Sequence, residues 1–360
     1  MDRRSLIKNT GIAGVLAAGI APAVHAQEVI RWRIASSFPK SLDTIYGTAE
    51  VFAKKVGELS GGKFVVTAHP AGEIIPAVAG MVDNVSKGTL EMVSTASYFH
   101  FGVNDAFAFG TALPFGLNSR QQTSWMYDGN GGKLMREFYA KYNIVNFPMG
   151  QTGAQMGGWY RKQIKTVADL KGLKMRIGGF GGKVAARMGV IPQNIPAGEI
   201  YQALEKGTVD AAEFVGPYDD QKLGLNKVAP FYYYPGWWEG GAQIDCFVNK
   251  TAYDKLSPDH KAMLEAAAAF AHLDMQGKYD NRNPAALKQL VAGGAKLLPF
   301  PKVVMDEAFK QSQQMYAELS ASNPDWKKIY DDWSVFRRDQ NLWFRFTEMR
   351  MDQFMQAQKL

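Results

Sequence analysis

The sequence predicts an α/β protein with two domains, and three observations support this. The stretch 169–219 alternates strands, turns and helices within about fifty residues, which is the rhythm of a parallel α/β sheet. Two similar strand–helix units precede it within the first hundred residues. The chain has 360 residues, whereas a single hydrophobic core rarely extends beyond roughly 250–300 residues. Pattern and length together therefore favour two α/β domains.

The stretch 169–219 places a basic and an acidic side chain in two of its expected strands. Strands are expected at 173–177 and 209–215, helices at 183–188 and 199–206, and glycine or proline turns at 178–182 and 196–198. Arg176 lies at the end of the first strand and Glu213 lies in the last one. Because ligands of parallel α/β sheets bind at the carboxyl ends of strands, both side chains are candidate ligand-binding residues.

The rest of the chain continues the same pattern. Strands are expected at 29–35, 63–68, 90–95, 143–150, within 151–161, and at 244–248 and 297–298; helices are expected at 45–59, 78–87, 119–142 with a break at 129–132, and as a pair over 257–292. The aromatic, Pro/Gly-rich segment 231–241 is expected to cross between domains. We expect one domain from 27–150 with about 242–300, a second from 151–241, and a C-terminal helical region at 301–360.

The composition is that of an ordinary globular protein, with 46% hydrophobic residues, 21% charged residues and a formal net charge of +7. The charges are spread along the chain without a basic cluster, which argues against nucleic-acid binding. Cys246 lies in an apolar run and is expected in the core; a single cysteine forms neither an intramolecular disulfide nor a cysteine-based metal site. The five histidines show no metal-ligand spacing.

The N-terminus is typical of an export signal. A basic start precedes a small, apolar stretch at 11–23, and small residues at 24–26 offer a cleavage site. This stretch is too short to span a bilayer core of ~30 Å. The paired arginines near the start resemble a twin-arginine signal. We therefore expect residues 1–26 to be a signal peptide and the mature protein to be periplasmic; an uncleaved anchor is the alternative.

The chain shows no recognisable motif of a hydrolase, a metalloprotease or a phosphate-binding loop. The run GGFGG at 178–182 fits neither G-x-G-x-x-G nor G-x-x-x-x-G-K-[ST], so we interpret it as a turn that lets the backbone approach a ligand. Asp219 and Asp220 are adjacent carboxylates, but neighbouring side chains point in different directions. We expect them to cap a helix rather than to act as an acid–base pair. These observations do not favour an enzyme.

Arg176, Glu213 and Glu239 suggest how a small acid could bind. The planar guanidinium of arginine is the preferred bidentate partner of a carboxylate. If the three side chains converge, they carry a net charge of −1, and a bound monocarboxylate makes it −2. A cation with hard oxygen ligands would offset this charge in a closed cleft, Ca²⁺ fully and Na⁺ partly.

Several longer motifs resemble a known family. Three of them are DLKGLKMR (169–176), PAGEIYQALEKGTVDAAE (196–213) and the early loop SSFP (36–39). They closely resemble the substrate-binding proteins of tripartite ATP-independent periplasmic (TRAP) transporters, of the DctP type. The subgroup that binds 2-oxo or 2-hydroxy monocarboxylates with a metal ion is resembled at GAQMGGW (153–159), EFVGPYDD (213–220) and YYPGWWE (233–239). The resemblance covers most of the chain after the expected signal peptide.

The resemblance implies a two-domain binding protein whose interdomain cleft closes over an organic anion. It implies that Arg176 clamps the substrate carboxylate and that Gln155 contacts both substrate and metal. Glu213 and Glu239 would hold the cation with the backbone carbonyl of Phe214, which stands where the subgroup often has tryptophan and therefore lacks the indole N–H. The implied substrate site is Gln155, Arg176, Phe214 and Glu239, with Ser97, Tyr98 and Trp237 as pocket walls.

Aromatic residues at helical spacing mark the stretch 325–360. At 1.5 Å per residue, an unbroken helix of this length would be ~54 Å long, which exceeds the diameter of a small domain. One interpretation is a bent helix, or two helices, lying on the protein's own domains. The other is that the aromatic face is buried on a second subunit. Members of the resembled subgroup dimerise through a long C-terminal helix, so the resemblance implies a homodimer.

The residues and the resemblance together predict an extracytoplasmic solute receptor of a TRAP transporter. It would bind an acid of the pyruvate, 2-oxobutyrate or lactate type with Na⁺ or Ca²⁺ and deliver it to a membrane permease. The sequence does not choose among these acids or between the two cations. A periplasmic enzyme acting on small carboxylic acids and a sensory solute-binding module are the alternative predictions.

Overall fold

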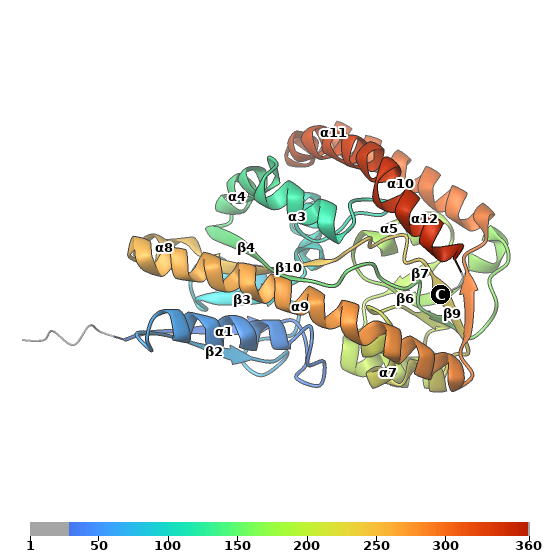
Figure 1. Cartoon of the computed structure of the whole chain (residues 1–360), viewed down its shortest axis with the longest axis horizontal. Helices are drawn as coiled ribbons and strands as arrows, with labels where there is room; N and C mark the ends of the chain where they lie inside the picture. The colour runs from blue at the N-terminus through green and yellow to red at the C-terminus, as the bar shows by residue number, and fades with distance from the viewer. Residues whose placement is uncertain (1–28, 359–360) are drawn as a thin grey trace, which may run out of the picture.

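The computed structural model describes residues 29–358, which form two lobes, each built on one β-sheet with helices around it (Figure 1). The α/β fold class predicted from the sequence is confirmed. The predicted signal peptide lies outside the described residues. Within 29–358, no helix combines the length and the apolar character needed to cross a membrane.

The first lobe contains a five-stranded mixed sheet. Its strand order is β2 (Phe64–His69), β1 (Ile30–Ser36), β3 (Met92–Thr95), β10 (Gln243–Asn249) and β4 (Ile144–Gln151). β1 is parallel to β2 and β3, and β10 is antiparallel to β3 and β4. All residues of β3 and β10 are buried, as expected for central strands covered by helices. The helices of this lobe are α1 (Gly47–Leu59), α2 (Met81–Lys87), α3 (Ser119–Tyr127), α4 (Gly131–Ala140) and α8 (Lys250–Asp254).

The second lobe contains a six-stranded sheet. Its strand order is β11 (Lys296–Pro299), β9 (Phe231–Tyr234), β5 (Trp159–Tyr160), β8 (Ala211–Ala212), β6 (Lys174–Arg176) and β7 (Ile191–Gln193). β6 is parallel to β7 and β8, whereas β5 is antiparallel to its two neighbours. The helices are α5 (Gly179–Arg187), α6 (Ile200–Glu205) and α7 (Pro217–Leu223).

Strands β9 and β11 of the second sheet differ from the arrangement predicted from the sequence. The segment 231–241, which we expect to be a crossing, begins with strand β9, because its aromatic residues pair with β5 on one side and β11 on the other. β11 itself lies in the second sheet, although the sequence analysis places residues up to about 300 with the first domain. The chain therefore returns to the second lobe after β10.

One long helix joins the two lobes. α9 (Pro258–Ala292) has 35 residues and packs against α1 and β4 of the first lobe and α7 of the second. Figure 1 shows it running along most of the molecule. The prediction of two helices is wrong here: the helix continues through Pro284 despite the backbone hydrogen bond that proline removes. Buried side chains on both sides of the proline, including Tyr279 and Leu290, hold the two parts in place.

The glycine-rich run behaves differently from the predicted turn. α5 begins at Gly179, so most of the run forms the first turns of a helix instead of preceding it. Gly179 has a φ of +54°, and a Cβ built on it would lie 2.9 Å from the Tyr98 ring. Glycine is therefore required here for both its backbone conformation and the close approach of the first lobe.

Asp219 and Asp220 do not cap a helix, contrary to the prediction. Both lie inside the first turn of α7, whose N-cap residue is Gly216. Both carboxylates are buried: Asp219 accepts a hydrogen bond from Tyr279 on α9, and Asp220 accepts hydrogen bonds from Tyr232 and Trp159 of the second sheet. They attach α7 to α9 and to the second sheet.

The C-terminal region consists of α10 (Lys302–Ser322), α11 (Pro324–Phe346) and α12 (Glu348–Gln356). The first half of α11 packs on its own chain, since Trp326, Ile329 and Trp333 are buried. Beyond this point the apolar side chains are exposed, including Trp343 (57% exposed) and Phe346 (68% exposed). The interpretation of helices lying on the protein's own domains therefore holds for the first half of α11, and burial on a second subunit stays a prediction for the exposed part.

Candidate functional site

Arg176 and Glu213 lie side by side at the carboxyl ends of β6 and β8. The strands are parallel, with Arg176 opposite Ala212, and the Glu213 N–H donates to the Arg176 carbonyl oxygen at 3.0 Å. The two side chains form an ion pair and are buried, with exposed fractions of 8% and 3%. Adjacent parallel strands thus bring together two residues that are 37 positions apart in the sequence.

The Arg176 guanidinium is fixed by the protein at two of its three nitrogens. Nη1 donates to the carboxylate of Glu213 and to its backbone oxygen (2.6 Å), and Nε donates to the Ile195 carbonyl oxygen (3.2 Å). Among the described residues, Nη2 has no hydrogen-bond partner. The Phe214 ring lies 5.4 Å from the guanidinium carbon. An entering carboxylate therefore meets a charged donor that is already held in position.

Gln155 and Glu239 form the second part of the site. Gln155 lies in the loop after β4 and Glu239 in the loop after β9; the Gln155 N–H donates to the Glu239 carbonyl oxygen at 3.2 Å and links the two loops. The Gln155 side-chain amide donates to Thr152 at 3.3 Å. Both side chains are buried, yet Oε1 of Gln155 and Oε2 of Glu239 have no hydrogen-bond partner among the described residues.

These two oxygens fit a bound cation. A buried polar atom without a partner is costly, by about 1–3 kcal/mol, and hard cations such as Ca²⁺ prefer carboxylate, amide and carbonyl oxygens. Within 29–358 no group of three or more His, Cys, Asp and Glu side chains is placed to hold a metal ion. The set here is of another kind, because it would combine the carboxylates of Glu213 and Glu239 with an amide oxygen and a backbone carbonyl.

The electrostatics of the two glutamates follow from their burial. Loss of solvent and, to a smaller extent, the neighbouring Glu213 carboxylate raise the pKa of Glu239 to about 8, against the lowering influence of the Tyr98 hydroxyl and Arg176. Burial also raises the pKa of Glu213, against the lowering influence of Arg176 and of the Gly178 N–H, which donates to it at 2.8 Å. The site therefore favours proton or cation uptake at its carboxylates.

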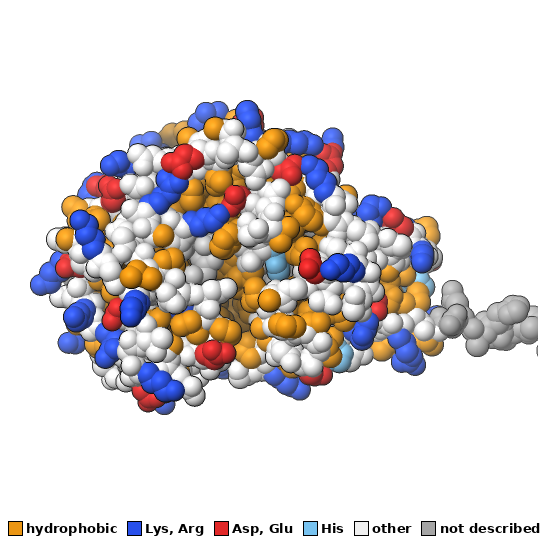
Figure 2. Space-filling view, turned by 180° about the vertical axis from the view of Figure 1, so that it is seen from behind, with side chains coloured by type: hydrophobic (Ala, Val, Ile, Leu, Met, Phe, Trp, Pro, Cys, Tyr) orange, Lys and Arg blue, Asp and Glu red, His pale blue; other side chains and the backbone are white. Residues whose placement is uncertain are grey.

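Two neighbouring cavities are lined by Arg176 and Phe214, whereas Glu213 and Glu239 line neither of them. A small cavity of about 20 Å³ is lined by residues of both lobes, among them Phe38, Tyr98, Gln155, Arg176 and Phe214. A cavity of about 450 Å³ shares Arg176, Phe214, Phe38 and Phe99 with it. Figure 2 shows a hollow in the middle of one face with hydrophobic side chains around it. Of the predicted site residues, Tyr98, Gln155, Arg176 and Phe214 therefore line a cavity between the two lobes.

Not every predicted wall lies at these cavities. Tyr98 and Phe214 line the smaller one, but Ser97 and Trp237 are not among the residues that line either. The Ser97 hydroxyl donates to the Phe107 carbonyl oxygen at 2.7 Å, and Trp237 stacks on Phe115 with ring centroids 5.5 Å apart. Both are therefore engaged in holding the first lobe and its neighbouring loops.

Sequence reasoning missed two walls that the structure shows. Phe38 and Phe99 line both cavities. Phe38 follows β1 directly, within the loop SSFP, so the rule that ligands bind at the carboxyl ends of strands was a signal that could have found it. Phe99 follows β3 in the same way, inside the short 3-10 helix Ser97–His100.

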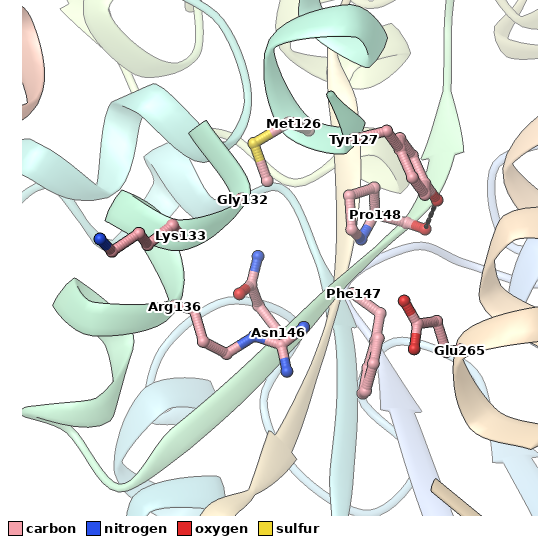
Figure 3. Close-up of a pocket in the computed structure, with 9 residues that line it drawn as sticks. All are labelled: Met126, Tyr127, Gly132, Lys133, Arg136, Asn146, Phe147, Pro148 and Glu265. Atoms are coloured by element: carbon pink, nitrogen blue, oxygen red, sulfur yellow. Dashed lines mark hydrogen bonds between the residues drawn. The ribbon is translucent and has the colours of Figure 1, made fainter. Parts of the chain in front are cut away.

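A third hollow, of about 310 Å³, lies outside this site, between the α3–α4 corner, β4 and α9 (Figure 3). Arg136 lies over the Phe147 ring at 4.8 Å, and the Tyr127 hydroxyl reaches the Pro148 carbonyl oxygen at 3.5 Å. The hollow contains none of the predicted site residues. The interlobe site is therefore the candidate functional site.

Comparison with known proteins identifies the family of this chain. The pattern of the DctP family, bacterial extracellular solute-binding proteins of family 7, matches residues 35–323. This chain belongs to the DctP family. A monocarboxylate 2-oxoacid-binding periplasmic protein of Nostoc sp., all3028, is 47% identical over 325 residues, which span 90% of this chain and 89% of the relative.

Solved structures of similar proteins have the same fold. A TRAP transporter solute-binding protein from Bordetella bronchiseptica, a mixed-occupancy dimer with copurified calcium and picolinate, is 53% identical with a TM-score of 0.90, covering 92% of this chain and 98% of that one. TRAP solute-binding proteins with bound pyruvate come from Colwellia psychrerythraea, with calcium (35% identical, TM-score 0.87, 90% and 99% covered), and Pseudoalteromonas atlantica, with sodium (36%, 0.88, 92% and 100%). The predicted role as a periplasmic TRAP solute receptor is confirmed.

Proposed function

We propose that this chain binds a 2-oxo or 2-hydroxy monocarboxylate together with Ca²⁺ or Na⁺ and delivers it to a membrane permease. The substrate carboxylate accepts hydrogen bonds from Nη2 of Arg176. The cation would be held by Gln155, Glu213, Glu239 and the Phe214 carbonyl oxygen, where it would offset the negative charge of the site. Acids of the pyruvate, 2-oxobutyrate and lactate type have the required pair of oxygens.

One observation carries this proposal: among the described residues, the buried oxygens Oε1 of Gln155 and Oε2 of Glu239 lack hydrogen-bond partners, and the fixed Arg176 guanidinium has one nitrogen without a partner. A neutral ligand would leave the free nitrogen and the two oxygens without charged partners. A carboxylate alone would satisfy Arg176 but would add negative charge beside Glu213 and Glu239. A carboxylate with a cation satisfies all of these groups at once.

The relatives support the same ligand pair. The Nostoc relative is named for 2-oxo monocarboxylates, and two solved relatives contain pyruvate, one with calcium and one with sodium. The picolinate of the Bordetella relative has a ring nitrogen next to its carboxylate. It therefore offers a two-atom chelating edge like that of a 2-oxo acid.

The arrangement also supports a receptor that closes on its ligand, with the two lobes acting as its two domains. The small cavity is lined by Phe38 and Tyr98 from the first lobe and by Arg176 and Phe214 from the second. A ligand that contacts both lobes has a higher affinity for the closed form and shifts the population toward it. We propose that the permease recognises the closed form and that the protein itself catalyses no reaction.

A homodimer formed through α11 and α12 is part of the proposal. Leu342, Trp343, Phe346 and Phe354 are each more than half exposed, and Figure 1 shows these helices on the outside of the molecule. Contiguous exposed apolar side chains of this kind usually mark an interface. A second copy is the occupant we propose, because the Bordetella relative was found as a dimer.

Calorimetric titration of protein that has been unfolded and refolded to remove ligand tests the function. Pyruvate, 2-oxobutyrate and lactate would each be titrated with Ca²⁺, with Na⁺ and after metal depletion, and the solutions would be assayed for turnover. We expect cation-dependent binding without turnover. Binding that ignores the cation would remove Gln155 and Glu239 from the proposed site. Consumption of the acid would favour an enzyme, whereas cation-dependent binding with capture of a sensor protein instead of a permease would favour the sensory module.

A further inference from the structure

The larger cavity beside Arg176 is far bigger than a three-carbon acid requires. Its volume of about 450 Å³ falls within the range of sites for small molecules, roughly 300–1,000 Å³. It adjoins the proposed carboxylate position, since Arg176 and Phe214 line both this cavity and the smaller one. The volume is therefore available to another part of the same ligand.

The wall of this cavity is mainly apolar and comes from both lobes. It is formed by Phe38, Phe99 and the segment PAVA (76–79) from the first lobe and by Phe214 and the segment NIPA (194–197) from the second. Arg176 is the one ionisable side chain among its lining residues. Ser37 and Asn194 are its other polar lining residues; the Ser37 hydroxyl already donates to Thr95 at 2.8 Å, which leaves the Asn194 amide. A charged or hydroxylated side chain would find few partners here.

The chemistry of a 2-oxo acid directs its side chain toward this cavity. In the planar acid, the 2-oxo oxygen and one carboxylate oxygen share one edge of the molecule, which is the edge that faces a cation. C3 and the other carboxylate oxygen share the opposite edge. In the proposed function Arg176 binds that second oxygen. The group on C3 therefore extends past Arg176, which is one of the residues that line the cavity.

We propose that the cavity receives the side chain of the substrate and that this side chain is an aromatic ring, so that the preferred ligand is a 2-oxo acid of the arylpyruvate class. This inference rests on the proposed function. A ring can pack on the edges and faces of Phe38, Phe99 and Phe214, and aromatic pairs contribute beyond the area they bury. Phe38 and Phe99 already lie 6.3 Å apart between centroids, at an angle of 49°.

The alternatives fit the cavity less well. A methyl group leaves most of the apolar wall in contact with water, and a flexible alkyl chain loses more conformational freedom on binding than a ring with two rotatable bonds. A second carboxylate would lie against apolar residues with no free cation among those that line the cavity other than Arg176. Size and polarity therefore favour an aryl group.

The test is a calorimetric ligand series on the refolded, full mature chain with Ca²⁺ present. Pyruvate, 4-methyl-2-oxopentanoate, phenylpyruvate and 3-phenylpropanoate would be titrated under identical conditions. Burial of the ring should lower the Kd of phenylpyruvate at least about tenfold relative to pyruvate, with the aliphatic acid in between. 3-Phenylpropanoate, which has the ring and the carboxylate but no 2-oxo group, should bind more weakly than phenylpyruvate.

A cavity-filling variant locates the effect. In Ala77→Phe the new ring takes up part of the cavity, so we expect the ratio of the two dissociation constants to fall to about one. The matched control is Ala266→Phe, since Ala266 is an exposed alanine on α9 and does not line the cavity. In this control the ratio of the pyruvate and phenylpyruvate dissociation constants should equal that of the wild type. Melting temperatures of both variants would establish that they are folded, and the ligand series on the wild type does not depend on either variant.

Each outcome decides between the claims. Tighter phenylpyruvate binding that is lost in Ala77→Phe supports the inference. Pyruvate binding with equal or weaker phenylpyruvate binding overturns it and leaves the proposed function intact. An affinity gain that survives in Ala77→Phe overturns the assigned location. Failure of every acid in the series to bind overturns the proposed function and this inference with it.

Discussion

The side chains of Arg176 and Glu213 form a buried ion pair across the parallel strands β6 and β8. This pair fixes the guanidinium while Nη2 stays free of hydrogen bonds to the described residues. A buried ion pair is a weak source of stability, because desolvation offsets much of the attraction. Its role here is to position a charged donor at the site before the ligand arrives.

Arg176→Lys should weaken binding of the acid without unfolding the protein. Lysine keeps the charge beside Glu213 but loses the planar arrangement that serves Glu213, Ile195 and the ligand together. We expect the Kd for pyruvate to rise by about 10–100-fold, the effect of losing one charge-assisted hydrogen bond. Calorimetry measures this. Arg161→Lys, at an exposed arginine of the same lobe, should leave the Kd unchanged, and an unchanged Kd in Arg176→Lys would remove the clamp from the account.

Cation affinity should rise with pH up to about pH 8. The pKa of Glu239 is raised from 4.5 to about 8, mainly by burial, so below this value the folded protein holds a proton that the cation must displace. We expect Ca²⁺ affinity to increase by about tenfold per pH unit between pH 6 and 7.5 for one released proton. Calorimetry in buffers of different ionisation enthalpy counts the protons released.

The same shift predicts the opposite trend for stability without cation. Between pH 4.5 and about 8 the unfolded chain loses the Glu239 proton while the folded protein retains it, so this group's contribution to the free energy of unfolding declines as pH rises. The melting temperature of wild type relative to Glu239→Gln should fall across this window, and the gain on adding Ca²⁺ should grow. A pH-independent difference between the two proteins would show that Glu239 is already ionised.

Contacts between the lobes around Asp43 should favour the closed form. Asp43, in the loop after β1, accepts hydrogen bonds from Lys222 and Tyr218 (3.1 Å) on α7 and from Arg282 (3.2 Å) on α9. These groups are partly exposed, and such pairs contribute about 0.2–1 kcal/mol. Lys222→Met should therefore raise the Kd of the acid by up to about fivefold, with the difference shrinking at high salt.

Lys227→Met is the matched control for this contact. Lys227 is an exposed lysine close to α7 with no ion pair among the described residues. The Kd of the acid for Lys227→Met should match that for the wild type at every salt concentration. Equal effects of the two substitutions would mean that the net charge of this face, and not the contact with Asp43, governs affinity.

The C-terminal half of the aromatic stripe should control the oligomeric state. Trp343→Ser combined with Phe346→Ser removes two exposed apolar side chains of α11. Light scattering should give a dimer for wild type and a monomer for the variant. The variant monomer should remain folded because neither side chain is buried in its own chain, although its melting temperature should lose the contribution of dimer formation. A monomeric wild type would refute the dimer.

The fold could be predicted largely from local pattern, whereas the exceptions depend on distant partners. Alternating hydrophobicity and glycine turns define most strands and helices, and the strand-end rule identifies Arg176 and Glu213. The single helix α9 could not be predicted, because Pro284 indicates a break and only packing against both lobes overrides it. The buried carboxylates of Asp219 and Asp220 likewise depend on distant partners. Asp219 accepts a hydrogen bond from Tyr279, 60 residues away, and Asp220 accepts one from Tyr232, 12 residues away.

The candidate site shows the same division. The structure links Gln155 to Glu239 and Arg176 to Glu213, and these contacts could not be read from the sequence. Whether a side chain faces the cleft depends on backbone direction in the folded protein, which turns Ser97 toward Phe107 and brings Phe99 to the cavity wall. The nitrogen of Arg176 and the oxygens of Gln155 and Glu239 that lack partners within 29–358 can be recognised only in three dimensions.

The most direct test of the account is a crystal structure of the ligand-stripped protein with added pyruvate and Ca²⁺, using the anomalous signal of calcium. We predict an anomalous peak at bonding distance from Oε1 of Gln155 and the carboxylates of Glu213 and Glu239, with the pyruvate carboxylate on Nη2 of Arg176. Pyruvate bound elsewhere, or bound at Arg176 with no calcium peak beside Gln155 and Glu239, would contradict the account.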